Sequence, residues 1–376
     1  MNSPTRSRLI VAVLLVLANA CSAFAAPATL PADLAPFFRA PEKFANVSDG
    51  RRPPLLRADG SRITDARDWP KQRAELRRQW FELMGPWPEL LSTPKLEKVK
   101  VEPRDNVQQH TIRLELAPGL MAHALLLVPN GSGPFPAVVV PFYEPETSVG
   151  LAGKPLRDFG YQLTRRGIVT LCIGAPGGDA RLPAIGDAKC QPLSFLAYIA
   201  ANCHTALSRM REVDSARIGI VGHSYGGKWA MFASCLYDNF ACAVWSDPGI
   251  VFDETRTSIN YQEPWYLGLD PSTQRSPGLV SAKSPRTGAY KTMMERGRDL
   301  HELHALMAPR PFLVSGGSED GVERWKSLNH AIEVNRLLGF NERVGMTNRE
   351  KHDPTVESNE AIYRFFEHFL AGNKVR

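Results

Sequence analysis

Residues 217–229 read RIGIVGHSYGGKW, and this stretch decides how the rest of the chain is interpreted. It contains the pattern G-x-S-x-G around Ser224, between an apolar run and a segment with helical spacing. A strand, a sharp turn and a helix in this order expose a serine hydroxyl at the turn. The glycines suit such a turn because strand and helix pass too close there for Cβ atoms. We therefore expect Ser224 to be a nucleophile rather than part of a plain glycine-rich turn.

The helix expected after Ser224 also offers main-chain donors for a negatively charged oxygen. N–H groups at a helix N-terminus lack partners within the helix and lie at the positive end of its dipole. We expect an oxyanion hole made by the N–H of Tyr225 and one N–H from the loop after Pro141, either that of Phe142 or that of Tyr143.

Apolar strands alternate with helical segments on both sides of this stretch. The expected strands are 98–101, 110–116, 121–128, 137–141, 168–173, 217–222, 241–246, 311–315 and 343–347. The expected helices are 193–211, 225–237, 323–338 and 357–371. Strands that are apolar on both faces and alternate with helices indicate a parallel sheet covered on both sides. The sequence therefore predicts an α/β fold.

A serine nucleophile needs a general base, and His352 is the best placed histidine. It stands in a turn-rich loop, residues 348–354, between the last expected strand and the last expected helix. In folds with this elbow the chain order is serine, acid, histidine. Structural roles are expected for His368, on the last helix, and for His301 and His304, which precede a Pro-Arg-Pro run.

Three carboxylates compete to orient the imidazole of His352. Asp320 and Glu319 follow the strand 311–315, and Asp320 has the commoner G-x-x-D spacing from Gly317. Asp247 follows the strand 241–246, which supplies the acid in some hydrolases. Asp320 is the preferred choice, with Glu319 and Asp247 as alternatives.

Residues 1–26 read as a secretory signal peptide. Arg6 and Arg8 precede an apolar run, residues 9–17, and an A-x-A cleavage pattern follows at 23–25. Cys21 raises a lipoprotein alternative, which is less favoured because no large aliphatic residue stands three positions before it. We expect a secreted or periplasmic protein with no membrane association after cleavage, because no later segment is long and apolar enough to span a bilayer.

Charge and cysteine usage exclude several classes of function. The formal net charge of +6 is modest and falls to +4 without the two signal arginines, and the basic residues are scattered, so nucleic-acid binding is not expected. Five cysteines follow the signal, an odd number that leaves at least one thiol unpaired within the chain. The sequence has no H-E-x-x-H motif and no phosphate-binding loop, so we expect no metal and no cofactor.

Two segments lie outside the alternating pattern. Residues 27–95 form a proline-rich lead with an amphipathic helix at Trp69–Met84, whose Arg73 and Arg77 are typical of a solvated helix face. Within the main domain, residues 96–376, the stretch at about 248–300 is rich in Pro, Gly, Tyr and Trp. Insertions of this kind commonly shape the rim of an active site.

Several of these features together resemble bacterial carbohydrate esterases of the α/β-hydrolase superfamily. They are the elbow at Ser224, Lys228 four residues later, the run 299–311 that ends in APRP, and the motifs at 68–76 and 85–88. The most similar groups are the glucuronoyl esterases and the acetyl-xylan-esterase-like and pectin-methylesterase-like enzymes. The resemblance covers most of residues 60–371. It implies the α/β-hydrolase fold, a mostly parallel central sheet with helices on both faces, an N-terminal helical lead and an insertion after the sixth strand of that fold.

The resemblance also implies substrate-binding residues. In glucuronoyl esterases the lysine at the position of Lys228 helps to bind hydroxyls of the uronate, and an arginine directly after the serine assists the oxyanion. This chain keeps the lysine but has Tyr225 where the arginine would stand, which departs from the glucuronoyl esterase pattern. Trp265 and Tyr266 in the insertion offer an aromatic platform for a sugar ring, or else pack the insertion onto the domain.

The expected function is that of a secreted serine esterase acting on carbohydrate esters of a plant or algal polysaccharide or oligosaccharide. Uronic acid methyl or alkyl esters are preferred as the substrate, because a cation near the serine suits a uronate acyl group. An O-acetyl esterase of the acetyl xylan type is the alternative. A serine peptidase and a non-catalytic binding protein with the same fold are further alternatives, and the latter predicts that a member of the triad is missing.

Overall fold

One sheet organises the part of the chain that the structure describes. The computed structural model describes residues 29–180, 183–255, 264–270, 272–273 and 279–372. Within these residues nine strands form a single sheet in the order β1-β2-β3-β5-β4-β6-β7-β8-β9. The first three strands and β5 pair in antiparallel fashion, and all pairs from β5 onward across the sheet are parallel. This confirms the α/β fold with a mostly parallel sheet.

Burial differs along the sheet as the two types of pairing require. The antiparallel strands are β1 (Leu96–Arg104), β2 (Val107–Ala117) and β3 (Leu120–Pro129). In β2 buried and accessible positions largely alternate, because one face of this part of the sheet meets solvent. The parallel strands are buried on both faces, as helices cover both sides; they are β4 (Phe135–Pro141), β5 (Val169–Ile173), β6 (Val213–His223), β7 (Ala243–Ser246), β8 (Phe312–Gly316) and β9 (Val344–Asn348).

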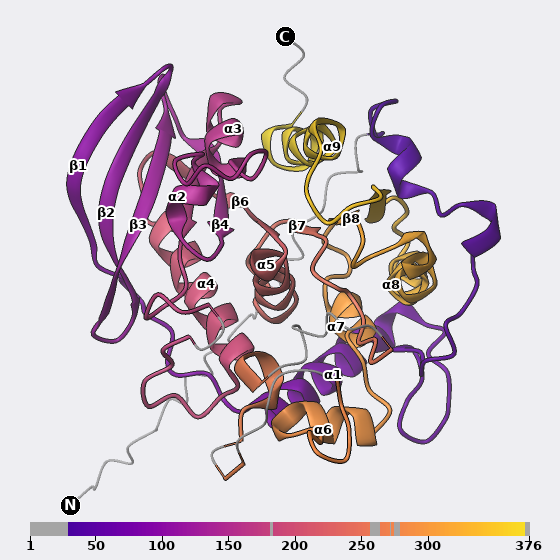
Figure 1. Cartoon of the computed structure of the whole chain (residues 1–376). Coiled ribbons are helices and arrows are strands. Elements are labelled where there is room, and N and C mark those ends of the chain that lie inside the picture. The colour runs from indigo at the N-terminus through magenta and orange to yellow at the C-terminus, as the bar shows by residue number, and fades with distance from the viewer. Residues whose placement is uncertain (1–28, 181–182, 256–263, 271, 274–278, 373–376) are drawn as a thin grey trace, which may run out of the picture.

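Helices pack on both faces of the sheet, as Figure 1 shows. On one side lie α1 (Trp69–Met84), α4 (Pro192–Ser208), α5 (Tyr225–Leu236), α7 (His301–Leu306) and α8 (Trp325–Leu337), whose apolar side chains form the larger core. On the other side lie α3 (Phe159–Arg165) and α9 (Val356–Phe366), which continues as η7 (Glu367–Ala371). The short elements are η1 (Ala35–Phe38), η2 (Glu42–Phe44), η3 (Ala66–Asp68), α2 (Pro145–Ser148), η5 (Pro264–Gly268), α6 (Gly288–Glu295) and η6 (Val322–Arg324).

The lead segment is bonded to the sheet domain through helix α1. The indole Nε1–H of Trp80, which is fully buried, donates to Glu302 of α7 at 3.1 Å. The arginines on the other face of α1 are not simply solvated. Arg73 donates to the main-chain oxygen of Leu306, and both Arg73 and Arg77 pair with Asp238 at the end of α5.

The five cysteines after the signal region are all buried free thiols: Cys172, Cys190, Cys203, Cys235 and Cys242. Burial raises the pKa of the Cys172 thiol to about 12 and that of Cys190 to about 11. Thiols in such surroundings pack as small apolar side chains and are poor nucleophiles.

The signal peptide expected at residues 1–26 lies outside the described residues. Among the helices of the described part of the chain, we find none with the length and apolarity needed to span a bilayer.

Buried His204 makes the stability of the fold depend on pH. His204 lies in the last turn and a half of α4, and its Nε2–H donates to the main-chain oxygen of Asn239 at 3.0 Å. Burial lowers the pKa of His204 from 6.5 to about 4. The unfolded chain therefore binds a proton below pH 6.5 that the folded chain rejects, so stability falls as the pH drops from 6.5 to about 4.

We expect His204→Gln to remove this contribution. Between pH 6.5 and 4 the free energy of unfolding of the variant should fall less steeply than that of the wild type, by about 1.4 kcal/mol per pH unit. Urea unfolding at several pH values measures both slopes. Parallel curves for the two proteins would show that His204 does not titrate differently on folding.

Candidate active site

Ser224 occupies a strained turn between β6 and α5. Its backbone has φ 56° and ψ −119°, a conformation that residues with a Cβ rarely adopt. The N–H of Ser224 donates to the main-chain oxygen of Ser246 at the end of β7, at 2.7 Å. The strand, turn and helix predicted around this serine are therefore all present, and the turn lies at the carboxyl edge of the parallel sheet.

Two glycines make the turn possible by close approach rather than by unusual dihedral angles. A Cβ on Gly222 would lie 2.0 Å from the main-chain oxygen of Gly226. A Cβ on Gly226 would lie 2.1 Å from the main-chain oxygen of Pro141, at the end of β4. Any side chain at either position would push α5 away from the sheet and displace Ser224.

His352 links Ser224 to a carboxylate. It lies in the loop between β9 and α9, as predicted, and its Nε2 is 2.8 Å from the Oγ of Ser224. Its Nδ1 is 2.7 Å from Oδ2 of Asp247, which is fully buried. A carboxylate only accepts, so Nδ1 carries the proton, and Nε2 is left to accept the hydrogen bond of the serine hydroxyl. This is the arrangement in which an imidazole can take the proton of an attacking hydroxyl.

The carboxylate at His352 belongs to Asp247 and not to Asp320, which corrects the preference drawn from the sequence. Oδ1 of Asp247 accepts from the N–H groups of Gly317 at 2.7 Å, of Asp320 at 2.9 Å and of Glu319 at 3.1 Å. The loop after β8 thus supplies main-chain donors that hold Asp247. It does not supply the acid.

Asp320 is turned away from the imidazole by a reciprocal exchange of hydrogen bonds. Its two carboxylate oxygens accept from the N–H groups of Gly249 at 2.8 Å and Ile250 at 2.6 Å, in the loop after β7. Burial and the nearby charge of Asp247 raise the pKa of Asp320. Asp320 therefore braces the loop that carries Asp247. Glu319, the other alternative, contributes its N–H to Asp247, and its side chain is partly buried.

Phe142 and Tyr143 in the loop after β4 are the two candidates for the second N–H of the oxyanion hole, and the N–H of Phe142 already has a main-chain partner. The N–H of Phe142 donates to the main-chain oxygen of Ile173 at 3.0 Å and so extends the pairing of β4 with β5. The expectation for Phe142 is therefore not met, and the N–H of Tyr143 stays as the candidate. Tyr143 lies beside the turn, with its ring stacked on that of Tyr225 at a centroid distance of 4.9 Å. Tyr225 is the first residue of α5.

Lys228 lies one turn along α5 from Ser224, but its side chain is fully buried. The ammonium donates to the main-chain oxygen of Gly249 in the loop after β7. Burial lowers the pKa of Lys228, while the charges of Asp320 and Asp299 act in the opposite direction. The observed contacts of Lys228 are with the protein itself, and its contact with a uronate stays a prediction.

The aromatic residues expected in the insertion are only partly described. Tyr266 in η5 is buried, with its ring centroid 6.0 Å from that of Tyr225, so it packs behind the turn. The side chain of Trp265 lies outside the described part of the structure.

Sequence reasoning missed two residues at this site, His223 and Arg349. The ring of His223 lies 4.7 Å from that of His352, and its Nδ1 is 3.1 Å from the Oγ of Ser246. Burial and the nearby His352 and Arg349 lower the pKa of His223 well below its usual range, so it is neutral. The guanidinium of Arg349 donates to the main-chain oxygen of His352 and to that of Ser315 in β8. The only sequence signal for these residues is their position beside Ser224 and His352.

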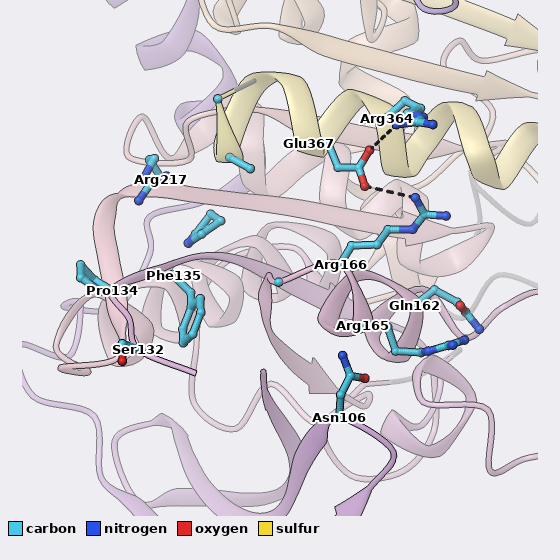
Figure 2. Close-up of a pocket in the computed structure, with 14 residues that line it drawn as sticks. Asn106, Ser132, Pro134, Phe135, Gln162, Arg165, Arg166, Arg217, Arg364 and Glu367 are labelled. Atoms are coloured by element: carbon cyan, nitrogen blue, oxygen red, sulfur yellow. Dashed lines mark hydrogen bonds and ion pairs between the residues drawn. The ribbon is translucent and has the colours of Figure 1, made fainter. Parts of the chain in front are cut away.

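A cavity of about 950 Å³ lies elsewhere, at the amino edge of the parallel strands (Figure 2). Its lining includes Phe135 at the start of β4 and several arginines, two of which, Arg166 and Arg364, bond to Glu367. None of the residues predicted for the active site lines this cavity. In the described ranges we also find no group of three or more His, Cys, Asp or Glu residues placed to hold a metal ion.

Comparisons of sequence cover only a part of the chain. Residues 200–322 match the model of the prolyl oligopeptidase family, which belongs to the α/β-hydrolase superfamily. This segment contains Ser224, Asp247 and Asp320 but not His352. No curated protein sequence matches the chain.

Comparisons of structure extend over most of the chain. A glucuronoyl esterase from Solibacter usitatus is 18% identical, with a TM-score of 0.65 over 86% of this chain and 98% of that one. A glucuronoyl esterase of carbohydrate esterase family 15 from Teredinibacter turnerae is 20% identical, with a TM-score of 0.60 over 88% and 92%. A putative acetyl xylan esterase from Bacteroides fragilis is 16% identical, with a TM-score of 0.53 over 82% and 80%.

These similarities agree with the nine-stranded, mostly parallel sheet described above. The chain has the α/β-hydrolase fold, and its structure is similar to those of glucuronoyl esterases and an acetyl-xylan-esterase-like protein.

Proposed function

We propose that the protein is a serine carboxylic-ester hydrolase that acts on carbohydrate esters. The observation that carries the proposal is the chain of contacts from Ser224 through His352 to Asp247, with distances of 2.8 and 2.7 Å. The three residues come from separate loops at one edge of the sheet. Ser224 is also held in a strained backbone conformation, and such conformations cluster at active sites.

The geometry supports a two-step mechanism. The Oγ of Ser224 attacks the ester carbonyl while His352 takes the hydroxyl proton. Asp247 stabilises the imidazolium that forms. The N–H groups of Tyr225 and Tyr143 are the proposed donors to the oxyanion. His352 then protonates the leaving alkoxide, which departs as the alcohol. Water activated by His352 hydrolyses the acyl-enzyme and restores Ser224.

The proposed substrate class rests on the structural neighbours and on one exposed aromatic residue. The neighbours are named as glucuronoyl esterases and a putative acetyl xylan esterase, names that describe hydrolases of carbohydrate esters. The side chain of Tyr143 is 39% exposed beside the nucleophile, where an aromatic face could contact a sugar ring. We propose uronic acid esters as the preferred substrates, O-acetyl esters as the second choice, and a plant or algal polysaccharide as their source.

A panel of defined esters tests this substrate preference. We expect kcat/KM for methyl glucuronate or methyl galacturonate esters to exceed that for acetylated xylan by at least about tenfold, because a pocket built for one ester must leave polar groups unpaired with another. Initial rates of acid release measure both, with Ser224→Ala as the blank. Exclusive deacetylation would eliminate the uronate proposal and leave the esterase proposal intact.

A serine peptidase is the second candidate, because the matched family model is that of the prolyl oligopeptidases. The same Ser224, His352 and Asp247 would serve an amide substrate. Turnover of chromogenic prolyl peptides but of no ester in the panel would favour this alternative.

We also propose that the protein is exported after cleavage of residues 1–26. The support is the pattern of charge, apolar run and small residues in the sequence. N-terminal sequencing of the exported protein should find a start near Pro27, and an intact Met1 in that fraction would contradict cleavage.

A further inference from the structure

Arg349 is a buried arginine placed between the two loops that meet at the imidazole. It directly follows β9 and precedes His352 by three residues. Its side chain is only 5% exposed, and its main-chain N–H donates to the oxygen of Gly316 at the end of β8, at 3.0 Å. The guanidinium group is thus enclosed by protein on the inner side of the His352 loop.

The guanidinium of Arg349 joins the His352 loop to the end of β8 by donating to main-chain oxygens of both. Nη2 donates to the oxygen of His352 at 2.6 Å, and Nε donates to that of Asp353 at 2.9 Å. On the other side Nη1 donates to the oxygens of Ser315 at 2.8 Å and of Gly316 at 3.2 Å. A planar group with five donors can make this set of bonds, and an ammonium cannot.

The charge of Arg349 is placed to act on the carboxylate of the triad. Nη2 lies 4.0 Å from Oδ2 of Asp247, the oxygen that accepts from His352. Its hydrogen bonds go to neutral oxygens, and the carboxylate of Asp247 lies within ion-pair distance without sharing a hydrogen bond with it. Burial lowers the pKa of Arg349, and the charges of Asp247 and Asp320 counteract this effect. The positive charge of the guanidinium therefore attracts the carboxylate of Asp247.

His352 needs such support because its own loop has no regular hydrogen-bonding pattern. The residues between β9 and α9 form bends and irregular structure, and the side chain of His352 is 33% exposed. The backbone of His352 is tied to β8 through Arg349. A displacement of about 1 Å between catalytic groups is enough to cost about a hundredfold in rate.

We propose that Arg349 is a positioning residue for the hydrolytic reaction. It holds the imidazole of His352 within hydrogen-bonding distance of Asp247 and Ser224, and it places a positive charge near the imidazole. This proposal rests on the proposed function, since it assigns Arg349 a task in the chemistry of that triad.

The charge effect should appear in the pH profile. The charged or titratable groups in contact with His352 include Asp247 at its Nδ1, His223 with its ring 4.7 Å away, and Arg349, which donates to its main-chain oxygen. Arg157, from the loop before α3, pairs with Asp353 of the His352 loop. His223 is neutral and Arg157 pairs with Asp353, so Arg349, which lies 4.0 Å from Asp247 and donates to the main-chain oxygen of His352, is the cation chosen for the test. Its loss favours the protonated imidazole.

The test compares Arg349→Gln and Arg349→Lys with Arg310→Gln. Arg310 is a matched control because its side chain is also largely enclosed, at 11% exposed, and donates to main-chain oxygens, those of Ser234, Phe240 and Leu306, but it lies at the opposite end of β8. We expect Arg349→Gln to lower kcat about a hundredfold with KM changed less than threefold, and to move the acid limb of the kcat/KM profile to higher pH. Arg349→Lys, which keeps the charge, should recover part of kcat and restore the acid limb.

The outcomes separate this proposal from the proposed function. Thermal unfolding of each variant gives the folded fraction to which kcat is normalised. A normalised kcat of Arg349→Gln within threefold of the wild type would overturn the proposal, as would an equal loss in Arg310→Gln, which would show a merely structural role. If Arg349→Gln does not fold, a normalised kcat of Arg349→Lys within threefold of the wild type would overturn the proposal, because an ammonium cannot make the bonds of the guanidinium. Failure of the proposed function itself would appear instead as unchanged ester turnover in Ser224→Ala.

Discussion

Ser224→Ala should lower kcat for ester hydrolysis by about 10⁵- to 10⁶-fold, because it removes the only oxygen that contacts Nε2 of His352 in the described structure. The residual rate would come from the main-chain donors of the turn and from substrate binding. The fold should change little, since the Oγ has its contact in the active site and the strained backbone is held by Gly222 and Gly226. Initial rates with an ester substrate measure the loss.

Ser234→Ala is the matched control for this variant. Ser234 lies on the same helix, is buried, and accepts from the indole of Trp245 at 3.1 Å, away from the turn. We expect its kcat to stay within about twofold of the wild type, although some stability is lost with the hydrogen bond. Comparable activity in Ser224→Ala and Ser234→Ala would eliminate Ser224 as the nucleophile.

Asp247→Asn should lower kcat by about 10³- to 10⁴-fold. An asparagine amide that keeps the main-chain bonds of Oδ1 would present its NH₂ group to Nδ1 of His352. The imidazole would then hold its proton on Nε2, where it cannot accept that of Ser224. Rates at saturating substrate, together with thermal unfolding to confirm the fold, measure the effect.

Asp320→Asn is the informative partner of this variant, because the two carboxylates are both buried and only one contacts His352. Asp320 bonds to the N–H groups of Gly249 and Ile250, so its substitution should reduce stability and lower kcat by no more than about tenfold. A larger loss of kcat in Asp320→Asn than in Asp247→Asn would contradict the assignment drawn from the geometry.

The elbow and the regular elements around it could be predicted from the sequence because local chemistry determines them. Glycine spacing and the apolar run before Ser224 specify the turn, and α4, α5 and α8, as well as α9 taken together with η7, begin and end within about three residues of the predicted limits. The loop position of His352 also follows from the order of strands and helices. Helix α6 lies within the expected insertion and α7 directly follows it. The sequence analysis predicts neither, because both helices are too short to give a clear periodic pattern.

The choice among the acids depends on features that have no sequence pattern. Asp247 adopts φ 50°, which turns its carboxylate toward the loop after β8. Asp320 and Asp247 then exchange hydrogen bonds with each other's loops. Asp247 and Asp320 both follow a strand at the same edge of the sheet. Sequence spacing does not show which of the two loops folds over the other, and this fold decides which carboxylate reaches His352.

The roles of Phe142 and Lys228 also depend on tertiary contacts. The N–H of Phe142 is used by the pairing between β4 and β5, which adds one residue beyond the predicted strand. Lys228 is buried because the loop after β7 folds over the side of α5 and offers the main-chain oxygen of Gly249. Neither contact leaves a local signature in the sequence.

Labelling with a fluorophosphonate tests the central claim, that Ser224 is a nucleophile activated by His352 and Asp247, most directly. The reagent reacts with an activated serine and not with an ordinary hydroxyl. We predict one adduct per chain, on the tryptic peptide that contains Ser224, with loss of esterase activity in proportion to labelling and much slower labelling of Asp247→Asn. An adduct on another residue, or full esterase activity in a protein labelled at Ser224, would contradict the claim.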